Sequence, residues 1–202
     1  MKEKYPAAIV LGASAGGPEA ILYLLRSLPN EYPVPIFVVL HMHPNQKGNF
    51  PSYCNKYCSL KVKEAEDKEV VLPGTVYIAP PNYHLLLERD RTLALSVDAR
   101  VKFSRPSIDV LFESAADVYK NELVGIILTG ANDDGADGLK KIKQLGGVTI
   151  VQDPATAAFA SMPKAAINIA QPDCISSLDE IIILLSHLFE QKTVSSRCRA
   201  AQ

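Results

Sequence analysis

The sequence predicts an α/β fold of three layers, α/β/α, built on a doubly wound, mostly parallel sheet with one antiparallel hairpin. Three observations support this prediction. Short apolar segments rich in valine and isoleucine recur along the chain, amphipathic helical patterns lie between several of them, and two alternating segments flank a charged turn. Strands buried on both faces are continuous apolar runs, whereas helices repeat their apolar residues with a period near 3.6.

Glycine, proline or asparagine bounds the expected strands, which lie at 7–11, 36–40, 76–79, 124–128 and 148–151. Two expected helices have apolar residues at positions i, i+3, i+4 and i+7. These residues are Ile21, Leu24, Leu25 and Leu28 in the first helix, and Ile108, Leu111, Phe112 and Ala115 in the second. Pro18 suits the first turn of the earlier helix, and Ser107 is placed to cap the later one.

The segments YHLLLE at 83–88 and TLALSV at 92–97 flank a charged turn and predict an antiparallel hairpin. We expect this hairpin at an edge of the sheet, which would make the sheet mixed. A last helix is expected from Leu178 to Glu190. The 202 residues are enough for one core, so we expect a single domain over 1–191, followed by a disordered tail over 192–202 that has little to bury.

Composition excludes several classes of function. The net charge is -1, from 21 basic and 22 acidic residues, so no overall attraction to nucleic acid or to an anionic membrane is expected. No apolar run approaches the roughly 18 residues of a membrane span, and MKEKYP lacks the apolar centre of a secretion signal. We therefore expect no direct membrane insertion, and a cytoplasmic location.

The four cysteines are expected to be reduced thiols, because a chain of this length has its own core. Cys54 and Cys58, with His41 and His43 upstream, are the zinc ligands that the sequence could offer. The C-x3-C spacing lacks a second pair of ligands, so we expect no metal.

A serine stands in the glycine-rich turn between the first strand and the first helix, in the sequence GASAGG at 12–17. Three interpretations fit this turn. Ser14 can be a nucleophile, because G-x-S-x-G presents a hydroxyl beside amides that hold an oxyanion. The loop can instead bind phosphate or a nucleotide, although both the G-x-G-x-x-G and the G-K-[ST] spacings are absent. The glycines can also serve only to pack the helix closely against the strand.

Potential partners for this serine follow two other expected strands. His41 and His43 come directly after the segment at 36–40, and Asp133 and Asp134 follow the segment at 124–128. Open α/β sheets gather their sites at the carboxyl ends of strands, so a nucleophile, a base and an orienting acid would meet at one edge. Spacing alone does not choose between the two histidines or between the two aspartates.

Six blocks of this sequence, in order over about 170 residues, resemble the catalytic domain of the CheB family of protein-glutamate methylesterases. The blocks are GASAGGPEA, LHMHP, GTVYIAPPNYHLLL, SRPSIDVLF, GIILTGANDDGADGL and FASMPKAAI. The resemblance implies a catalytic triad of Ser14, His41 and Asp134, with the Ala131 amide in the oxyanion hole. The amides of Gly16 and Gly17, at the start of the first helix, are further candidate donors. Departures from the family pattern at Ala15, Leu40 and Pro81 remove no member of the triad.

The resemblance also implies an activity and partners. Enzymes of the family hydrolyse methyl esters of receptor glutamates and release methanol, and many deamidate receptor glutamines. The expected partners are methylated chemoreceptor cytoplasmic helices, with a methyltransferase or other signalling proteins as further ones, and no cofactor is expected. Lys102, Arg105 and residues 43–50 are candidate receptor contacts.

The chain starts a few residues before the first expected strand, so we expect a catalytic domain without the family's N-terminal receiver domain. The alternative to an enzyme is a non-catalytic module that binds a receptor or a phosphate through the glycine-rich loop.

Overall fold

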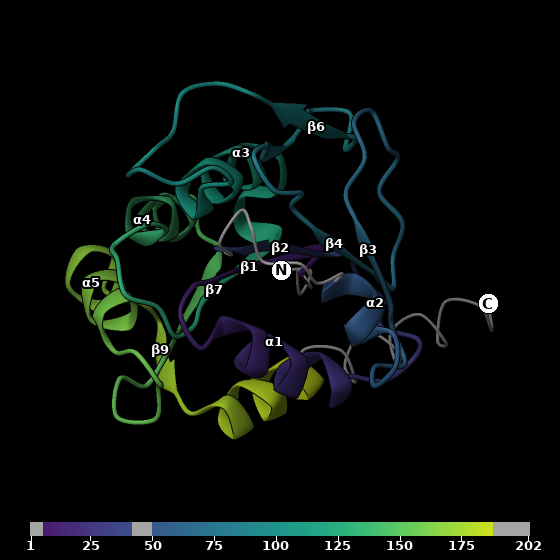
Figure 1. Ribbon diagram of the computed structural model, residues 1–202. Coiled ribbons are helices and arrows are strands. Elements are labelled where there is room, and N and C mark those ends of the chain that lie inside the picture. Colours follow the sequence, from purple (N-terminus) through teal and green to yellow (C-terminus); the bar gives the residue numbers. More distant parts are fainter. Residues whose placement is uncertain (1–5, 42–49, 188–202) are drawn as a thin grey trace, which may run out of the picture.

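The structure, a computed structural model, describes residues 6–41 and 50–187 and has three layers (Figure 1). Its central sheet has seven strands in the order β3-β4-β2-β1-β7-β8-β9, and every neighbouring pair is parallel. The strands are β1 (Ala8–Ala13), β2 (Ile36–Leu40), β3 (Lys61–Glu64), β4 (Thr75–Ile78), β7 (Leu123–Ile127), β8 (Val148–Gln152) and β9 (Cys174–Ser176). The predicted α/β/α class is confirmed.

Helices cover both faces of this sheet. They are α1 (Gly17–Arg26), α2 (Phe50–Cys54), α3 (Ile108–Tyr119), α4 (Ala136–Gln144) and α5 (Ser161–Ala170), with a short 3-10 turn η1 (Lys120–Glu122) after α3. A further helix occupies 178–187, where the description of the chain stops; the expected tail at 192–202 lies outside the described residues. No helix within residues 6–41 and 50–187 has the length and apolarity needed to cross a membrane.

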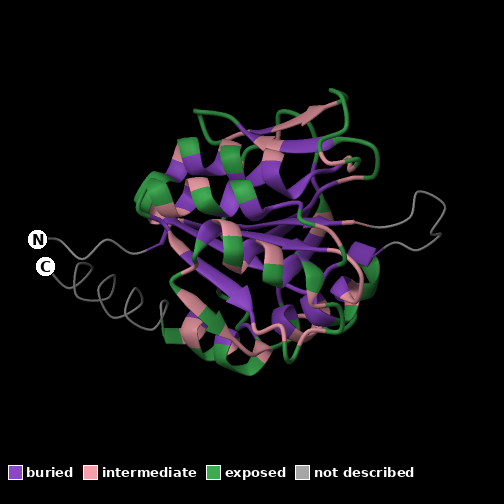
Figure 2. Cartoon of the chain, turned by 90° about the vertical axis from the view of Figure 1, so that its left-hand side faces the viewer, coloured by how far each residue is buried: buried purple, intermediate pink, exposed green. Residues whose placement is uncertain are grey.

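Two apolar cores, one on each side of the sheet, hold the layers together. The first joins the sheet to α1, α2 and the helix at 178–187, and the second joins it to α3, α4 and α5. Adjacent strand residues alternate between the two cores: Ile9 and Leu11 lie in the first, and Val10 lies in the second. This double burial explains the continuous apolar runs, and Figure 2 shows the buried sheet between partly exposed helices.

The predicted hairpin forms, but its predicted place is wrong. Strands β5 (His84–Leu87) and β6 (Leu93–Ser96) pair antiparallel as a separate two-stranded sheet, so the central sheet is not mixed. Leu85, Leu87 and Leu93 are buried in the core that includes α3, against which β5 packs. The apolar side of the hairpin therefore covers a helix, and the hairpin does not extend the edge of the central sheet.

The strand order brings three strand ends together. After β1 the chain fills one side of that strand with β2, β4 and β3, and then the other side with β7, β8 and β9. The carboxyl ends of β1, β2 and β7 are consequently neighbours at the point where the winding changes direction. In doubly wound folds this is the place where binding and catalytic residues gather.

Candidate active site

Ser14 stands directly after β1, in a tight turn that leads into α1. Its amide donates to the Thr129 carbonyl at 3.0 Å, and its carbonyl accepts from the Gly17 amide at 2.8 Å. Gly16 precedes the helix with φ of 73°, a left-handed conformation that favours glycine. A Cβ at Gly16 would also lie 2.8 Å from Ala158 Cβ, so the turn needs a glycine there for two reasons.

His41 follows β2 directly and lies beside the Ser14 turn. The register pairs Ala13 with Leu40, the last residues of β1 and β2, and the His41 amide donates to the Ala13 carbonyl at 3.0 Å. Neighbouring strands are about 4.8 Å apart, so the backbones of Ser14 and His41 start about one strand spacing from each other. The fold thus places the predicted nucleophile and base on adjacent strand ends.

Asp134 is the acid that meets His41. Its Oδ2 atom lies 2.9 Å from His41 Nε2, and its side chain is completely buried. The side chain of Asp133, in contrast, is 58 % exposed and lies 3.9 Å from Lys102 Nζ. The structure therefore separates two aspartates that spacing could not, while His43 lies outside the described residues.

The carboxylate of Asp134 is also the cap of helix α3. Oδ1 accepts from Ser107 Oγ at 2.8 Å and from the Asp109 amide at 3.1 Å, and Oδ2 accepts from the Ile108 amide at 2.8 Å. Ser107 occupies the N-cap position, but its side chain makes no capping hydrogen bond to the helix. The prediction that the Ser107 side chain caps this helix is therefore wrong. The Asp134 carboxylate, 26 residues downstream of Ile108, accepts from the free amides of the first turn and from the Ser107 hydroxyl.

These contacts decide the ionisation of Asp134. Burial alone raises the pKa of a carboxyl, but the hydrogen bonds from His41, from the Ile108 and Asp109 amides and from Ser107 outweigh it. The pKa of Asp134 consequently lies below its ordinary value. An ionised Asp134 can hold His41 with a proton on Nε2 and can stabilise the imidazolium when Nδ1 takes up a second proton.

Two glycines allow α3 to approach this carboxylate. A Cβ at Gly12 would lie 2.4 Å from Ile108 Cγ2, and one at Gly135 would lie 2.5 Å from the same atom. Gly135 also has φ of 98°. The end of β1 and the turn after Asp134 therefore carry glycines because the first turn of α3 packs directly against both.

Asn132 contacts the nitrogen of His41 that the serine would need. Asn132 Nδ2 lies 3.4 Å from His41 Nδ1, and Asn132 Oδ1 accepts from the Asp134 amide at 3.3 Å. Within the described part of the chain, no hydrogen bond joins Ser14 Oγ to His41. The predicted base and acid are thus hydrogen-bonded to each other, and Asn132 lies at the remaining ring nitrogen of His41.

The candidate oxyanion donors differ in their availability. The Gly17 amide already donates to the Ser14 carbonyl, whereas the Gly16 and Ala131 amides donate to no atom of the described residues. The Gly130 amide, next to Ala131, donates to the Phe159 carbonyl at 3.0 Å. Of the three predicted donors, Gly16 and Ala131 are therefore the better candidates.

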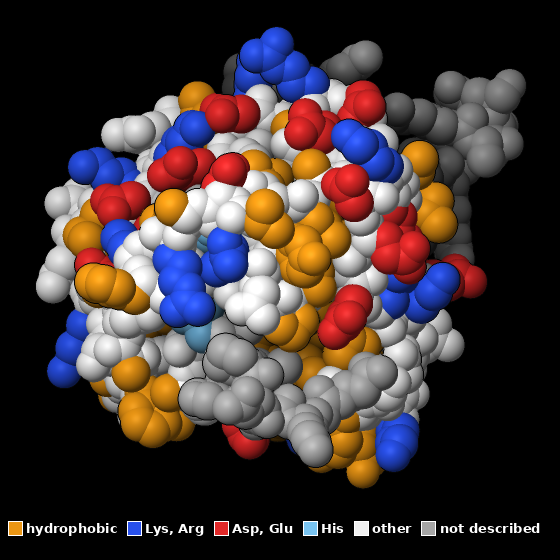
Figure 3. Space-filling model, turned by 45° about the horizontal axis from the view of Figure 1, so that its top comes forward, with side chains coloured by type: hydrophobic (Ala, Val, Ile, Leu, Met, Phe, Trp, Pro, Cys, Tyr) orange, Lys and Arg blue, Asp and Glu red, His pale blue; other side chains and the backbone are white. Residues whose placement is uncertain are grey.

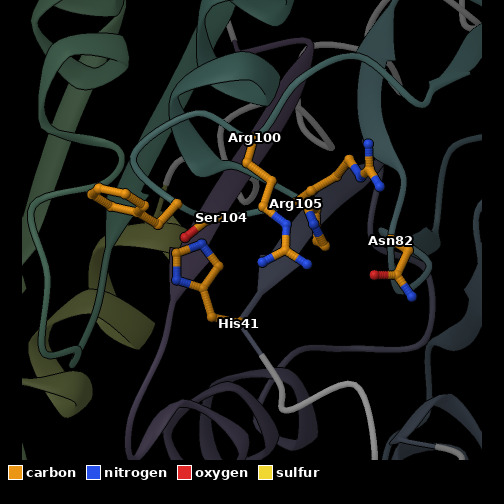
Figure 4. Close-up of a pocket in the computed structure, with 7 residues that line it drawn as sticks. His41, Asn82, Arg100, Ser104 and Arg105 are labelled. Atoms are coloured by element: carbon orange, nitrogen blue, oxygen red, sulfur yellow. The ribbon is translucent and has the colours of Figure 1, made fainter.

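A shallow pocket of about 140 Å³ opens beside His41. Its other lining residues are Asn82, Arg100, Phe103, Ser104, Arg105 and Pro106; neither Ser14 nor Asp134 is among them. In Figure 4, the Arg100 guanidinium and the Ser104 side chain lie beside the His41 ring. Figure 3 shows basic side chains gathered next to exposed histidine atoms on this face. Arg100 was not singled out from the sequence, because an exposed loop arginine has no pattern that distinguishes it.

Lys102, a predicted receptor contact, is engaged within the protein. Its ammonium lies 2.9 Å from Asp109 Oδ2 and 2.8 Å from Asp137 Oδ2, and it donates to the Asp133 carbonyl at 3.2 Å. Burial lowers the pKa of Lys102, but the two carboxylates outweigh burial and raise it. Burial raises the pKa of Asp109, and the nearby charge of Asp134 raises it further, whereas the Gly138 amide and Lys102 lower it. The net shift of the Asp109 pKa is upward. Lys102 therefore holds the loop before α3 onto α3 and α4.

No site for a metal ion is formed by three or more histidine, cysteine or acidic side chains within residues 6–41 and 50–187. Cys54, Cys58 and Cys174 are free thiols. Burial, reinforced by the neighbouring Cys58, raises the pKa of Cys54 to about 12. A thiol with such a pKa is a weak nucleophile and a weak metal ligand at neutral pH.

Comparison with known proteins decides the family. The model of the family described as CheB methylesterase matches residues 9–185. This chain belongs to the CheB methylesterase family. A Leptospira interrogans member, with the provisional name protein-glutamate methylesterase/protein-glutamine glutaminase, is 50% identical over 190 residues, which are 94% of this chain and 98% of the relative.

Other members of the family extend the comparison. The crystal structure of the Thermotoga maritima CheB methylesterase catalytic domain has a TM-score of 0.86 and 35% identity, and the match covers 91% of this chain and 98% of that one. A Clostridium acetobutylicum protein named protein-glutamate methylesterase/protein-glutamine glutaminase is 36% identical over 174 residues. The match covers 86% of this chain and 50% of that relative, so the chain spans about half of the longer protein. The predicted family and fold are confirmed.

Proposed function

We propose that this chain is a protein-glutamate methylesterase that hydrolyses glutamate methyl esters on chemoreceptors, releasing methanol, and that it also deamidates receptor glutamines. The observation that carries the proposal is the buried Asp134 carboxylate held 2.9 Å from His41 Nε2 beside the Ser14 turn. It occurs in a chain that is 50% identical, over nearly its whole length, to a relative named for both activities.

The contacts of His41 support a role for each of its ring nitrogens. Because Asp134 holds Nε2, Nδ1 is the atom that accepts the Ser14 proton, and the Asn132 amide has to release Nδ1 first. Ser14 Oγ attacks the ester carbonyl to form a tetrahedral intermediate. That intermediate collapses when the proton on Nδ1 passes to the departing methoxide, so methanol leaves and an acyl-enzyme remains.

Deacylation repeats these proton transfers with water. Nδ1 takes a proton from water as its oxygen attacks the acyl carbonyl, and the same proton returns to Ser14 Oγ when the glutamic acid leaves. The acid then releases its remaining proton to solvent and becomes the carboxylate. The oxyanion of both intermediates would accept from the Gly16 and Ala131 amides, which donate to no other atom within residues 6–41 and 50–187. For a glutamine substrate the first leaving group is ammonia, and the remaining steps are the same.

The substrate is proposed to be a side chain presented by a protein. The pocket beside His41 has only about 140 Å³, and its rim includes the exposed side chains of Asn82, Arg100 and Phe103, so it would take the end of one side chain while the rest of the substrate stays on the surface. We propose the cytoplasmic helices of a methylated receptor as this partner.

A serine-directed phosphonate tests the nucleophile, the base and the oxyanion site together. We expect it to modify Ser14, and we expect Ser14→Ala to abolish both labelling and methanol release. Ser104→Ala is the matched control, because Ser104 lines the pocket beside His41 and should be dispensable. Full turnover by Ser14→Ala, or labelling that maps to Ser104, would exclude the proposed chemistry. Receptor binding without any turnover would favour the non-catalytic module.

A further inference from the structure

A turn at the rim of the pocket displays a large apolar side chain to solvent. Phe103 is 94% exposed and has φ of 64°, and its neighbour Lys102 has φ of 47°. Two successive residues other than glycine in the left-handed region are unusual, and for a bulky residue such as phenylalanine this conformation is a genuine outlier. Strain of this kind persists only where surrounding contacts enforce it, and it concentrates at functional sites.

The surrounding contacts do enforce this turn. Residues 97–106, which we name the arm, are fixed at three points. Lys102 pairs with Asp109 and Asp137, as described above. The backbones of Val101 and Ser104 exchange hydrogen bonds of 3.1 and 2.8 Å. Near the ends of the arm, Arg105 Nη1 donates to the Val97 and Asp98 carbonyls. The arm is thus pre-organised, and Phe103 stays exposed although the arm is held on the protein.

The arm also carries positive charge that the described residues do not neutralise. Arg100 makes no hydrogen bond or ion pair with any of them, and Arg105 bonds only to backbone carbonyls. The carboxylates of Asp109 and Asp137 are paired with Lys102, and that of Asp133 lies 3.9 Å from the same lysine. The one acid of the arm itself, Asp98, forms no ion pair with the described residues. An apolar side chain and two unpaired cations therefore border the same pocket as His41.

We propose that the arm is the surface that docks the substrate protein, with Phe103 packing on apolar side chains and Arg100 pairing with carboxylates beside the reacting residue. This inference rests on the proposed function and names the partner chemistry of the same site. Each ester or amide hydrolysed leaves a glutamate, so a segment with several modified positions becomes acidic during the reaction. An acidic segment that also presents apolar side chains is therefore the occupant that the arm fits.

The test compares three ester substrates with the full chain. The first is p-nitrophenyl acetate, the second is a helical peptide with one glutamate methyl ester between glutamates, and the third is that peptide with alanines at the flanking positions. We expect Arg100→Gln to lower kcat/KM for the acidic peptide about three- to fivefold at low salt and to leave the alanine peptide unchanged. We expect Phe103→Gly to lower kcat/KM for both peptides about fivefold. For each variant, any loss with the small ester should be smaller than the loss with the acidic peptide.

A stability measurement separates docking from a structural role. Phe103→Gly relieves a left-handed phenylalanine that buries almost nothing, so its thermal midpoint should equal or exceed that of the original chain. Arg89→Gln, on the hairpin turn, and Leu72→Ala, before the amino end of β4, are exposed controls that should change none of these values.

The outcomes separate the two proposals. If the original chain hydrolyses none of the three esters, the proposed function fails, and the docking surface fails with it. If the original chain demethylates the peptides and both arm variants do so with unchanged kcat/KM, the proposed function stands and the arm is not the docking surface. A loss that extends equally to p-nitrophenyl acetate would also refute docking, because it would place the effect in the chemistry.

Discussion

Asp134→Asn is the substitution that most directly tests how this site is built. The carboxylate accepts four hydrogen bonds, two at each oxygen, and three of the donors belong to the first turn of α3 and its N-cap. Asparagine has nearly the same shape but replaces one acceptor oxygen with a donor. The variant therefore probes hydrogen bonding and charge while the volume of the side chain stays almost constant.

Either orientation of the new amide leaves one conflict. With the NH2 group at the Oδ2 position, it faces the Ile108 amide and forces His41 to accept at Nε2, which puts the proton on Nδ1 and removes the base. With the NH2 group at the Oδ1 position, it faces the Asp109 amide, whereas the Ser107 hydroxyl can turn to accept. The second orientation is better for the fold, and it keeps the working tautomer of His41.

The magnitudes follow from this second orientation. One buried amide without an acceptor costs about 1 to 3 kcal/mol, and the remaining bonds lose their charge assistance, so we expect the free energy of unfolding to fall by about 2 to 4 kcal/mol. The imidazolium loses a carboxylate at a charge separation of about 4 Å, worth about 4 kcal/mol at an effective dielectric constant of 20. That loss corresponds to a decrease in kcat of about three orders of magnitude.

Urea unfolding monitored by circular dichroism measures the first value, and methanol release at saturating methylated substrate measures the second. Asp133→Asn is the matched control, because the adjacent carboxylate is exposed and lies 3.9 Å from the lysine ammonium. We expect this control to change stability by less than about 1 kcal/mol and to keep kcat. Equal losses in the two variants, or near-normal turnover by Asp134→Asn, would refute the assignment of the acid.

Three further predictions concern the same junction. Ser107→Ala removes a 2.8 Å hydrogen bond to Asp134 in a buried place, and urea unfolding should show a loss of about 1 to 2 kcal/mol; an unchanged midpoint would mean that this bond contributes nothing. Gly12→Ala should destabilise the fold by about 1 to 3 kcal/mol and reduce turnover, because its Cβ would lie 2.4 Å from Ile108 Cγ2; both effects can be measured on one preparation. The lowered pKa of Asp134 stabilises the fold at pH values above the ordinary aspartate pKa of about 3.9, and this stabilisation is lost as pH falls through the lower pKa of the folded state. The difference in unfolding free energy between the original chain and Asp134→Asn should therefore shrink in unfolding curves taken below about pH 4.

The sequence predicted the buried strands well because each is an apolar run between turn residues. It missed β3 and β9, and the reason is visible in their exposure. In Lys61–Glu64 only Val62 is buried, and in Cys174–Ser176 no residue is fully buried. Both are edge strands, which have solvent on one side and need few apolar residues. The hairpin was predicted from its alternation, but alternation does not say which element its apolar side will cover.

The residues of the candidate site, like the strands, could be predicted from the sequence only in part. Ser14 and His41 could be found because each directly follows a strand, and Asp134 because it lies in the loop between β7 and α4; the topology of parallel sheets brings such positions together. The choice of Asp134 over Asp133 needed the family resemblance, because only the packing of α3 buries one of them. The bond from Ser107 to Asp134 joins residues 27 apart and leaves no local pattern in the sequence.

The first turn of α3 contacts both Asp134, the proposed catalytic acid, and the arm, so substitutions in this turn should affect both. The Asp109 amide holds Asp134, while the Asp109 carboxylate pairs with Lys102 at 2.9 Å and accepts from the Gly138 amide at 2.8 Å. A change in this turn should therefore alter kcat and the KM for a protein substrate together. A change at Phe103 touches only the exposed end of the arm and should alter the KM alone. The exposed docking residues Arg100 and Phe103 can accordingly change to suit a different substrate protein without disturbing the proposed catalytic residues.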